Sequence, residues 1–143
     1  MEFPSTLSSL FSDENFANYP KVLIPQIFND DRGSIKNLAD GRLGDVAIIS
    51  SQKSSIRANH VHENDWHFSY LVFGQMRYFW KDSNRQVQSL IVKAGEMVYT
   101  PPKIPHKMQF LEESVFIAIS ELSRSQNNYE ADTKKIPENF FEK

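Results

Sequence analysis

The sequence predicts an all-β fold, an antiparallel barrel or sandwich made by a single domain. Two observations lead to this prediction: about ten short apolar runs rich in β-branched and aromatic residues, and turn residues that separate these runs at regular spacing. No convincing helical periodicity lies between the runs, so alternating strand and helix units are not expected. The length of 143 residues fits one domain with a core of its own.

The first strands are expected after Pro20, where short apolar runs separated by turn residues begin. The turn-forming residues 29–33 and 39–44 separate the first three of them, and Gly74-Gln75 is interpreted as the turn of a β-hairpin. The proline-rich residues 101–105 form a rigid turn that is poorly suited to lie inside a sheet. The predicted strands span residues 22–28, 34–38, 46–50, 56–62, 68–73, 76–81, 86–92, 97–100, 107–110 and 115–120.

Three parts of the chain are expected to differ in role. Residues 1–19 form an N-terminal arm with a short helix, residues 20–123 form the barrel, and residues 124–143 form a polar C-terminal segment. Phe140 and Phe141 suggest that this last segment docks on the barrel, and a frayed tail is the alternative.

Composition excludes several classes of function. A net charge of −2 gives no electrostatic surface for nucleic acid or an anionic membrane, so neither is expected as a partner. The absence of cysteine excludes disulfides, thiolate zinc sites and cysteine nucleophiles. Neither an apolar run of about 20 residues nor a signal-peptide pattern is present, so a cytoplasmic protein is expected.

All four histidines fall in two short stretches. His60 and His62 are two apart on a predicted strand, so their side chains point to the same face. His67 follows at the start of the next strand, and the proline-rich turn aims His106 at the start of another. Converging neutral imidazoles are the ligands of a divalent transition metal, and zinc, iron, manganese and nickel all accept them.

The two stretches resemble the two motifs of the cupin superfamily. The first motif matches His60-Val61-His62, a gap of four residues, His67, and Gly74 after six more. The second motif matches Gly95, Pro101 and His106. The resemblance implies a jelly-roll barrel with one metal ion held by His60, His62, His67 and His106. The sequence departs from the motifs at His67, Lys103 and Phe110, where cupins carry glutamate, glycine and asparagine.

A narrower resemblance is to cupins that act on nucleotide sugars. The turn at Asp31-Arg32-Gly33 and the segment Arg57-Ala58-Asn59-His60 are similar to segments of the dTDP-4-dehydrorhamnose 3,5-epimerases, and sugar ketoisomerases carry a similar strand. In those epimerases the matching histidine is a general base and no metal is required, so the resemblance implies that role for His60 in a metal-free site.

Strand alternation predicts the remaining wall of the site. Ser69 shares a face with His67, and Met108 and Phe110 share a face with His106. Arg57 is expected to reach an anionic substrate. Asn59 should point away from the His60 face, and Glu63 and Asp65 are expected to be solvated loop charges, with a contribution to the metal as the alternative.

These observations favour an enzyme that epimerises or keto-isomerises a sugar or nucleotide sugar, with the metal polarising a carbonyl group. The expected partner is a small-molecule substrate, sugar-like or a keto or hydroxy compound. Two alternatives stay open: an iron dioxygenase with an all-histidine site, and a binding module without catalysis. Cupins often pair through their outer sheets and N-terminal arms, so the resemblance implies a homodimer.

Overall fold

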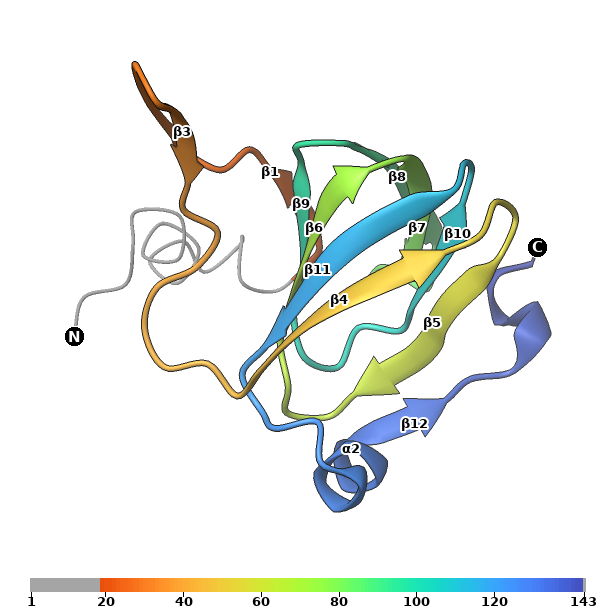
Figure 1. Ribbon diagram of the computed structural model, residues 1–143. Helices are drawn as coiled ribbons and strands as arrows, with labels where there is room; N and C mark the ends of the chain where they lie inside the picture. The colour runs from red at the N-terminus through yellow and green to blue at the C-terminus, as the bar shows by residue number, and fades with distance from the viewer. Residues whose placement is uncertain (1–18, 143) are drawn as a thin grey trace.

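The computed structural model describes residues 19–142, and these build two five-stranded antiparallel sheets and a separate two-stranded hairpin (Figure 1). One sheet has the order β1-β9-β6-β11-β4 and the other has the order β12-β5-β10-β7-β8. The strands are β1 (Lys21–Leu23), β2 (Ile27–Asp30), β3 (Gly33–Lys36), β4 (Asp45–Ser51), β5 (Ile56–His62), β6 (His67–Phe73), β7 (Gln75–Lys81), β8 (Val87–Lys93), β9 (Met97–Thr100), β10 (His106–Phe110), β11 (Ser114–Ser120) and β12 (Thr133–Lys135). This two-sheet arrangement confirms the predicted all-β fold.

The core lies between the two sheets. Its larger cluster joins residues of β7 and β10 to residues of β6 and β11, and the Phe110 and Phe116 rings stack across it with centroids 5.6 Å apart. A second cluster gathers Trp66, Phe68 and Tyr99 around the β6–β9 pair. Phe68 and Tyr70 alternate along β6 with Ser69 and Leu71, so this second cluster lies on the opposite face of the sheet from the larger one.

Two local predictions were wrong. Residues 22–28 do not form one strand, because Pro25 lacks an N–H donor and separates β1, which pairs with β9, from β2, which pairs with β3. Gly74-Gln75 is not a hairpin turn: β6 and β7 belong to different sheets, and Gly74, at φ +95°, turns the chain from one sheet to the other.

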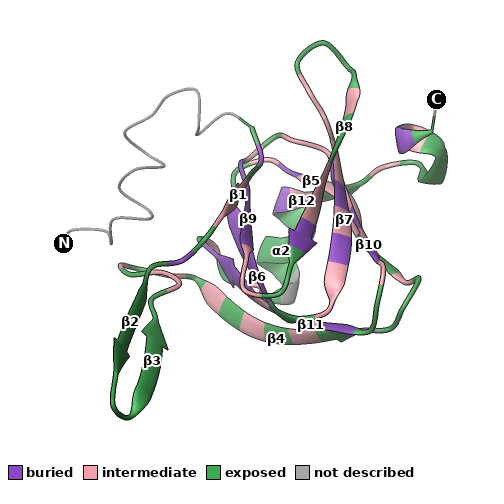
Figure 2. Ribbon diagram, turned by 90° about the horizontal axis from the view of Figure 1, so that it is seen from above, coloured by how far each residue is buried: buried purple, intermediate pink, exposed green. Residues whose placement is uncertain are grey.

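The β2–β3 hairpin stands away from the two sheets in both views (Figures 1 and 2). All eight residues of its two strands are exposed. Ile27, Phe28 and Ile35 therefore present large apolar side chains to water.

The C-terminal segment lies against the barrel. Helix α2 (Gln126–Asp132) leads into β12, which pairs with β5, and the 3-10 helix η2 (Glu138–Phe141) follows. Phe141 is buried, and its ring centroid lies 6.4 Å from that of Phe79 on β7. The predicted arm spans residues 1–19, and all of it except Tyr19 lies outside the described residues. Among the described helices, none is long and apolar enough to cross a membrane.

Candidate functional site

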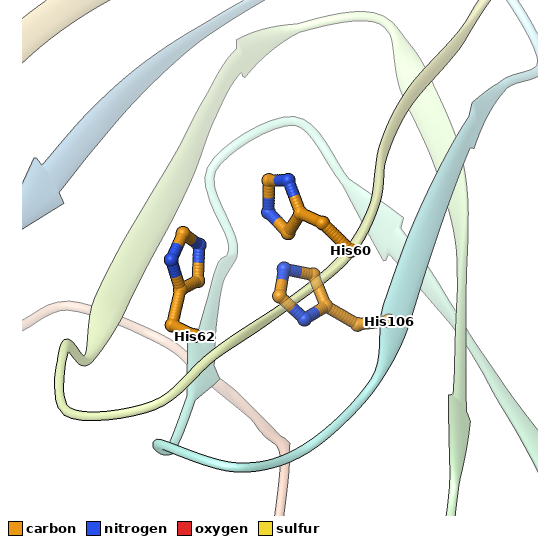
Figure 3. Close-up of side chains that lie close together, drawn as sticks. All are labelled: His60, His62 and His106. Atoms are coloured by element: carbon orange, nitrogen blue, oxygen red, sulfur yellow. The ribbon is translucent and has the colours of Figure 1, made fainter. Parts of the chain in front are cut away.

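Three histidine side chains meet at one end of the barrel (Figure 3). His60 and His62 come from β5, and His106, which opens β10, is the direct cross-strand partner of His60. The His60 ring centroid lies 4.4 Å from that of His62 and 4.8 Å from that of His106. One nitrogen of each ring lies within 4.8 Å of the other two. The pairing of β5 with β10 thus brings three imidazoles together, although His106 lies far from His60 and His62 in the sequence.

An irregularity in β5 sets the direction of these side chains. Ala58 and Asn59 both have positive φ, at 65° and 54°, and the pairing register with β10 shifts at this point. Such a bulge adds a residue on one strand and re-aims the side chains that flank it. Arg57 and His60, three apart in sequence, consequently line the same cavity. Asn59 instead contacts the backbone of Ile136 in the C-terminal segment.

Hydrogen bonds fix which ring nitrogens stay free. The His106 Nδ1 atom donates to the carbonyl oxygen of Ile104, 2.9 Å away. The His62 Nδ1 atom lies 3.1 Å from Thr133 Oγ1 and 3.5 Å from a carboxylate oxygen of Asp132. The His62 Nε2 atom is buried and has no hydrogen-bond partner among the described residues. Metal-bound histidines characteristically donate one ring N–H to a carbonyl or carboxylate and keep the other nitrogen for the ion.

His67 does not join the group formed by His60, His62 and His106. Its ring stacks on that of His62 with centroids 4.2 Å apart, but its Nε2 atom lies 2.9 Å from Asp65 Oδ2. His67, His62 and Asp65 thus form a second, overlapping group of potential ligands. The resemblance implied one group of four histidines, and the structure divides them because Asp65 holds one ring nitrogen of His67.

The expectation that Asp65 is a solvated loop charge was wrong. Asp65 is buried, and one of its carboxylate oxygens accepts the backbone N–H groups of Glu121 and Leu122, each at 3.0 Å. Burial alone would raise the pKa of Asp65, but the hydrogen bonds from His67 and Leu122 lower it below its ordinary value. Glu63, in contrast, is half exposed and lies 3.5 Å from the Lys134 ammonium group.

The three grouped histidines are held in the neutral form. Burial is the main cause, and it lowers the pKa of His60 to about 2, with a further contribution from repulsion by His106. Burial likewise lowers the pKa of His62 to about 4 and that of His106 to about 3. At neutral pH the group therefore offers nitrogen lone pairs without competition from protons.

A cavity of about 140 Å³ adjoins the histidines. His60, His67 and His106 line it, together with three of the other predicted site residues, Arg57, Ser69 and Met108. Phe110, which was predicted to line it, is fully buried in the core against Phe116. The Arg57 guanidinium is held in place by Ser51 Oγ and the Ser50 carbonyl oxygen, each 2.7 Å away.

Sequence reasoning missed the residues that the C-terminal segment contributes. Tyr129 on α2 lines the cavity, and its ring lies 6.4 Å from both the His60 and His62 rings. Arg124 lines the cavity as well, and Asp132 and Thr133 contact His62 from behind. The only signal for these contacts was the prediction that this segment docks on the barrel.

The fold is shared with solved structures of low sequence identity. ChmJ, a 3′-monoepimerase from Streptomyces bikiniensis solved with dTDP-quinovose, matches with a TM-score of 0.69 and 13% identity, over 84% of this chain and 70% of that one. QdtA, a sugar 3,4-ketoisomerase from Thermoanaerobacterium thermosaccharolyticum solved with TDP, matches with a TM-score of 0.68 and 14% identity, over 85% and 91%. A dTDP-4-dehydrorhamnose 3,5-epimerase from Sulfolobus tokodaii matches with a TM-score of 0.69 and 16% identity, over 85% and 78%.

The protein therefore has a cupin-type jelly-roll fold, which confirms the fold that the sequence resemblance implied. More narrowly, the fold resembles that of nucleotide-sugar epimerases and ketoisomerases. No protein-family model matches the sequence, and no curated protein matches it.

Proposed function

We propose that this protein is an isomerase or epimerase that acts on a sugar or a nucleotide sugar by moving a proton next to a carbonyl group. One observation carries the proposal: a cavity whose wall combines neutral imidazoles with a histidine held by a buried carboxylate. The likeness to the three nucleotide-sugar enzymes in fold supports the same reaction class.

A divalent transition metal fits the three grouped histidines. The ring nitrogens of His60, His62 and His106 lie within 4.8 Å of one another. Two metal–imidazole bonds of about 2.1 Å span at most about 4.2 Å, so small ring movements would bring all three nitrogens onto one ion. The unpartnered Nε2 atom of His62 supports the same assignment. Zinc, iron, manganese or nickel bound there would act as a Lewis acid that polarises the substrate carbonyl.

His67 is the base that this arrangement leaves free. If His60 is a metal ligand, it cannot also accept a proton, whereas His67 lies outside the group of three and still lines the cavity. The ionised Asp65 accepts the Nε2–H of His67, so Nδ1 carries the lone pair that takes the substrate proton. In this proposal His60 binds the metal and His67 is the base, whereas the epimerase resemblance implied that His60 is the base of a metal-free site.

Three further side chains are proposed to hold the substrate. Arg57 keeps a fixed positive charge at the cavity wall, where it would stabilise the oxyanion that forms as the proton leaves. Ser69 offers a hydroxyl for a sugar oxygen, and Met108 offers an apolar surface for the ring carbons.

The proposal is tested by incubating the zinc-loaded and manganese-loaded protein with dTDP-4-keto-6-deoxyglucose in heavy water. Deuterium should enter the carbon next to the carbonyl, and proton NMR measures its arrival. Oxygen consumption by the iron-loaded protein, without exchange, would instead identify a dioxygenase. Binding of the sugar nucleotide with neither exchange nor oxygen consumption would identify a module without catalysis.

We also propose that the protein is a homodimer built on the β2–β3 hairpin. An isolated two-stranded hairpin is marginally stable in water, and this one exposes 55% of Phe28 and 65% of Ile35. A second copy packed against the hairpin would bury these side chains and support its strands.

A further inference from the structure

A second cavity, three times larger than the one beside the histidines, opens at the end of β7. Its volume is about 420 Å³, against about 140 Å³ for the histidine cavity. The smaller cavity has room for little more than a sugar ring, whereas sites for drug-sized ligands occupy roughly 300–1,000 Å³. The larger cavity therefore has the size for the nucleotide part of a nucleotide sugar.

Two aromatic rings form one part of the wall. The Tyr19 and Trp80 rings lie nearly parallel, at 13°, with centroids 6.3 Å apart. The Trp80 Nε1 atom has no hydrogen-bond partner among the described residues. Flat aromatic faces bind nucleobases by stacking, and this interaction tolerates every base.

Cationic side chains form another part of the wall of the larger cavity. Lys81, Arg85 and Lys103 line the cavity, and the Lys81 ammonium group lies 3.8 Å from the Phe140 ring centroid. Asp82 is the one acidic residue among the described residues that line it. Its carboxylate already accepts the backbone N–H groups of Asn84 and Gln86, each at 2.9 Å. Glu142 lies outside this cavity, in a neighbouring hollow that Lys81 and Arg85 also line.

One short segment contributes to the walls of both cavities. Lys103, Ile104 and Pro105 line the larger cavity, and His106, which lines the smaller one, follows directly. His106 is also the cross-strand partner of Trp80. A ligand in the larger cavity thus lies next to the backbone that positions a proposed metal ligand.

We infer that the cavity lined by Tyr19, Trp80, Lys81, Arg85 and Lys103 is a binding site for a nucleoside diphosphate. The base stacks on Tyr19 and Trp80, and the phosphates lie against Arg85, Lys81 and Lys103. The site would hold the nucleotide part of a nucleotide-sugar substrate, so this inference rests on the proposed function.

Calorimetric titration of the full chain with dTDP, UDP and inorganic pyrophosphate tests the site. Arg85→Asn and Lys103→Asn should each weaken all three ligands about tenfold, because a charged hydrogen bond is lost. Asparagine suits both positions, since Arg85 has φ +61° and Lys103 has φ +67°. Tyr19→Ser should weaken dTDP and UDP about fivefold or more and leave pyrophosphate unchanged. Glu142→Gln should tighten all three, and Lys53→Gln, an exposed lysine on the β4–β5 turn, should change none.

The outcomes separate this inference from the proposed function. If dTDP binds with this pattern but deuterium exchange is absent, the nucleotide site stands and the reaction does not. If exchange occurs and the cavity variants bind dTDP as the wild type does, the nucleotide lies elsewhere and the inference is overturned. Absence of dTDP, UDP and pyrophosphate binding overturns it as well.

Discussion

The Nδ1 atom of His62 lies 3.1 Å from the hydroxyl of Thr133, although 71 residues separate the two along the chain. The contact exists because β12 pairs with β5, with Thr133 directly opposite His62. Asp132, the preceding residue, lies 3.5 Å from the same ring nitrogen and also accepts the backbone N–H of Asn64 at 2.7 Å. The C-terminal segment therefore orients a histidine of the candidate site.

Substitution of the groups that orient His62 should weaken metal binding. Asp132→Asn and Thr133→Val should each lower zinc affinity about 10- to 100-fold, because groups that hold the far nitrogen of a metal-bound histidine have effects of this size. Competition with a chromophoric chelator measures the affinity. Lys135→Ala, on the same strand but exposed, is the matched control. Unchanged zinc affinity in both site variants would contradict the proposed role of the segment.

The four histidines should divide into two functional groups. His62→Ala and His106→Ala should lose the metal, measured by elemental analysis of purified protein. His67→Gln should retain it and lose deuterium exchange by about 10²- to 10⁴-fold, the usual contribution of a general base. Loss of metal from the His67 variant would instead support a site of four histidine ligands, as the cupin resemblance implied.

Acid should destabilise the metal-free protein below the ordinary histidine pKa of about 6.5. The folded-state pKa values of His60, His62 and His106 are lowered to about 2, 4 and 3, so the unfolded state binds more protons between those values and 6.5. Stability is thus fully present above pH 6.5 and is lost as the pH falls. Each histidine contributes a slope of at most about 1.4 kcal/mol per pH unit.

Urea unfolding of the chelator-treated protein between pH 7 and pH 5 measures this slope. The double variant His62→Asn with His106→Asn should show a shallower slope, because two of the three depressed groups are gone. An equal slope in the wild type and in the double variant would show that other groups cause the acid sensitivity.

Gly74 should tolerate no side chain. A Cβ atom there would collide with Ser114 Oγ and would lie 2.6 Å from the Glu113 carbonyl oxygen, at a backbone φ of +95°. Gly74→Ala should cost about 2–5 kcal/mol from strain and overpacking together. Gly33→Ala is the control, since φ is also positive there but nothing lies within 4 Å of the added Cβ. Thermal unfolding of both variants checks the difference, and equal costs would refute the packing explanation.

The hairpin should control the oligomeric state. Phe28→Asp and Ile35→Asp each place a charge on the exposed apolar surface of β2–β3 and should convert a dimer to a monomer in sedimentation velocity. Ile56→Asp, at a similarly exposed position outside the hairpin, should leave the dimer intact. A monomeric wild-type protein would contradict the proposed homodimer.

The strand pattern could be predicted from sequence because apolar alternation and turn residues are local signals. Residues 56–62 and 97–100 were predicted with the bounds of β5 and β9. Pairing is not local, so nothing in the sequence placed β6 and β7 in different sheets. Pro25 was a local signal that the prediction of one strand over residues 22–28 overlooked.

The site was predictable where it rests on histidine spacing and not where it rests on tertiary contacts. His60, His62 and His106 converge, as two-residue spacing and the cupin motifs suggested. The positive φ of Ala58 left no mark in the sequence, and that of Asn59 left only a weak one, since asparagine tolerates this conformation but is common elsewhere. Asp65 resembled a surface charge until Glu121 and Leu122 supplied the N–H groups that stabilise it in a buried position.

The pairing of β12 with β5 has a consequence for how the protein matures during synthesis. A nascent chain that has emerged only through β11 contains all four histidines and every strand of the barrel except β12. It still lacks Tyr129, Asp132 and Thr133, the groups that cover and steady the imidazoles. Translation therefore has to pass residue 133 before the pocket reaches its mature form, and ions captured earlier would be held by unsupported rings.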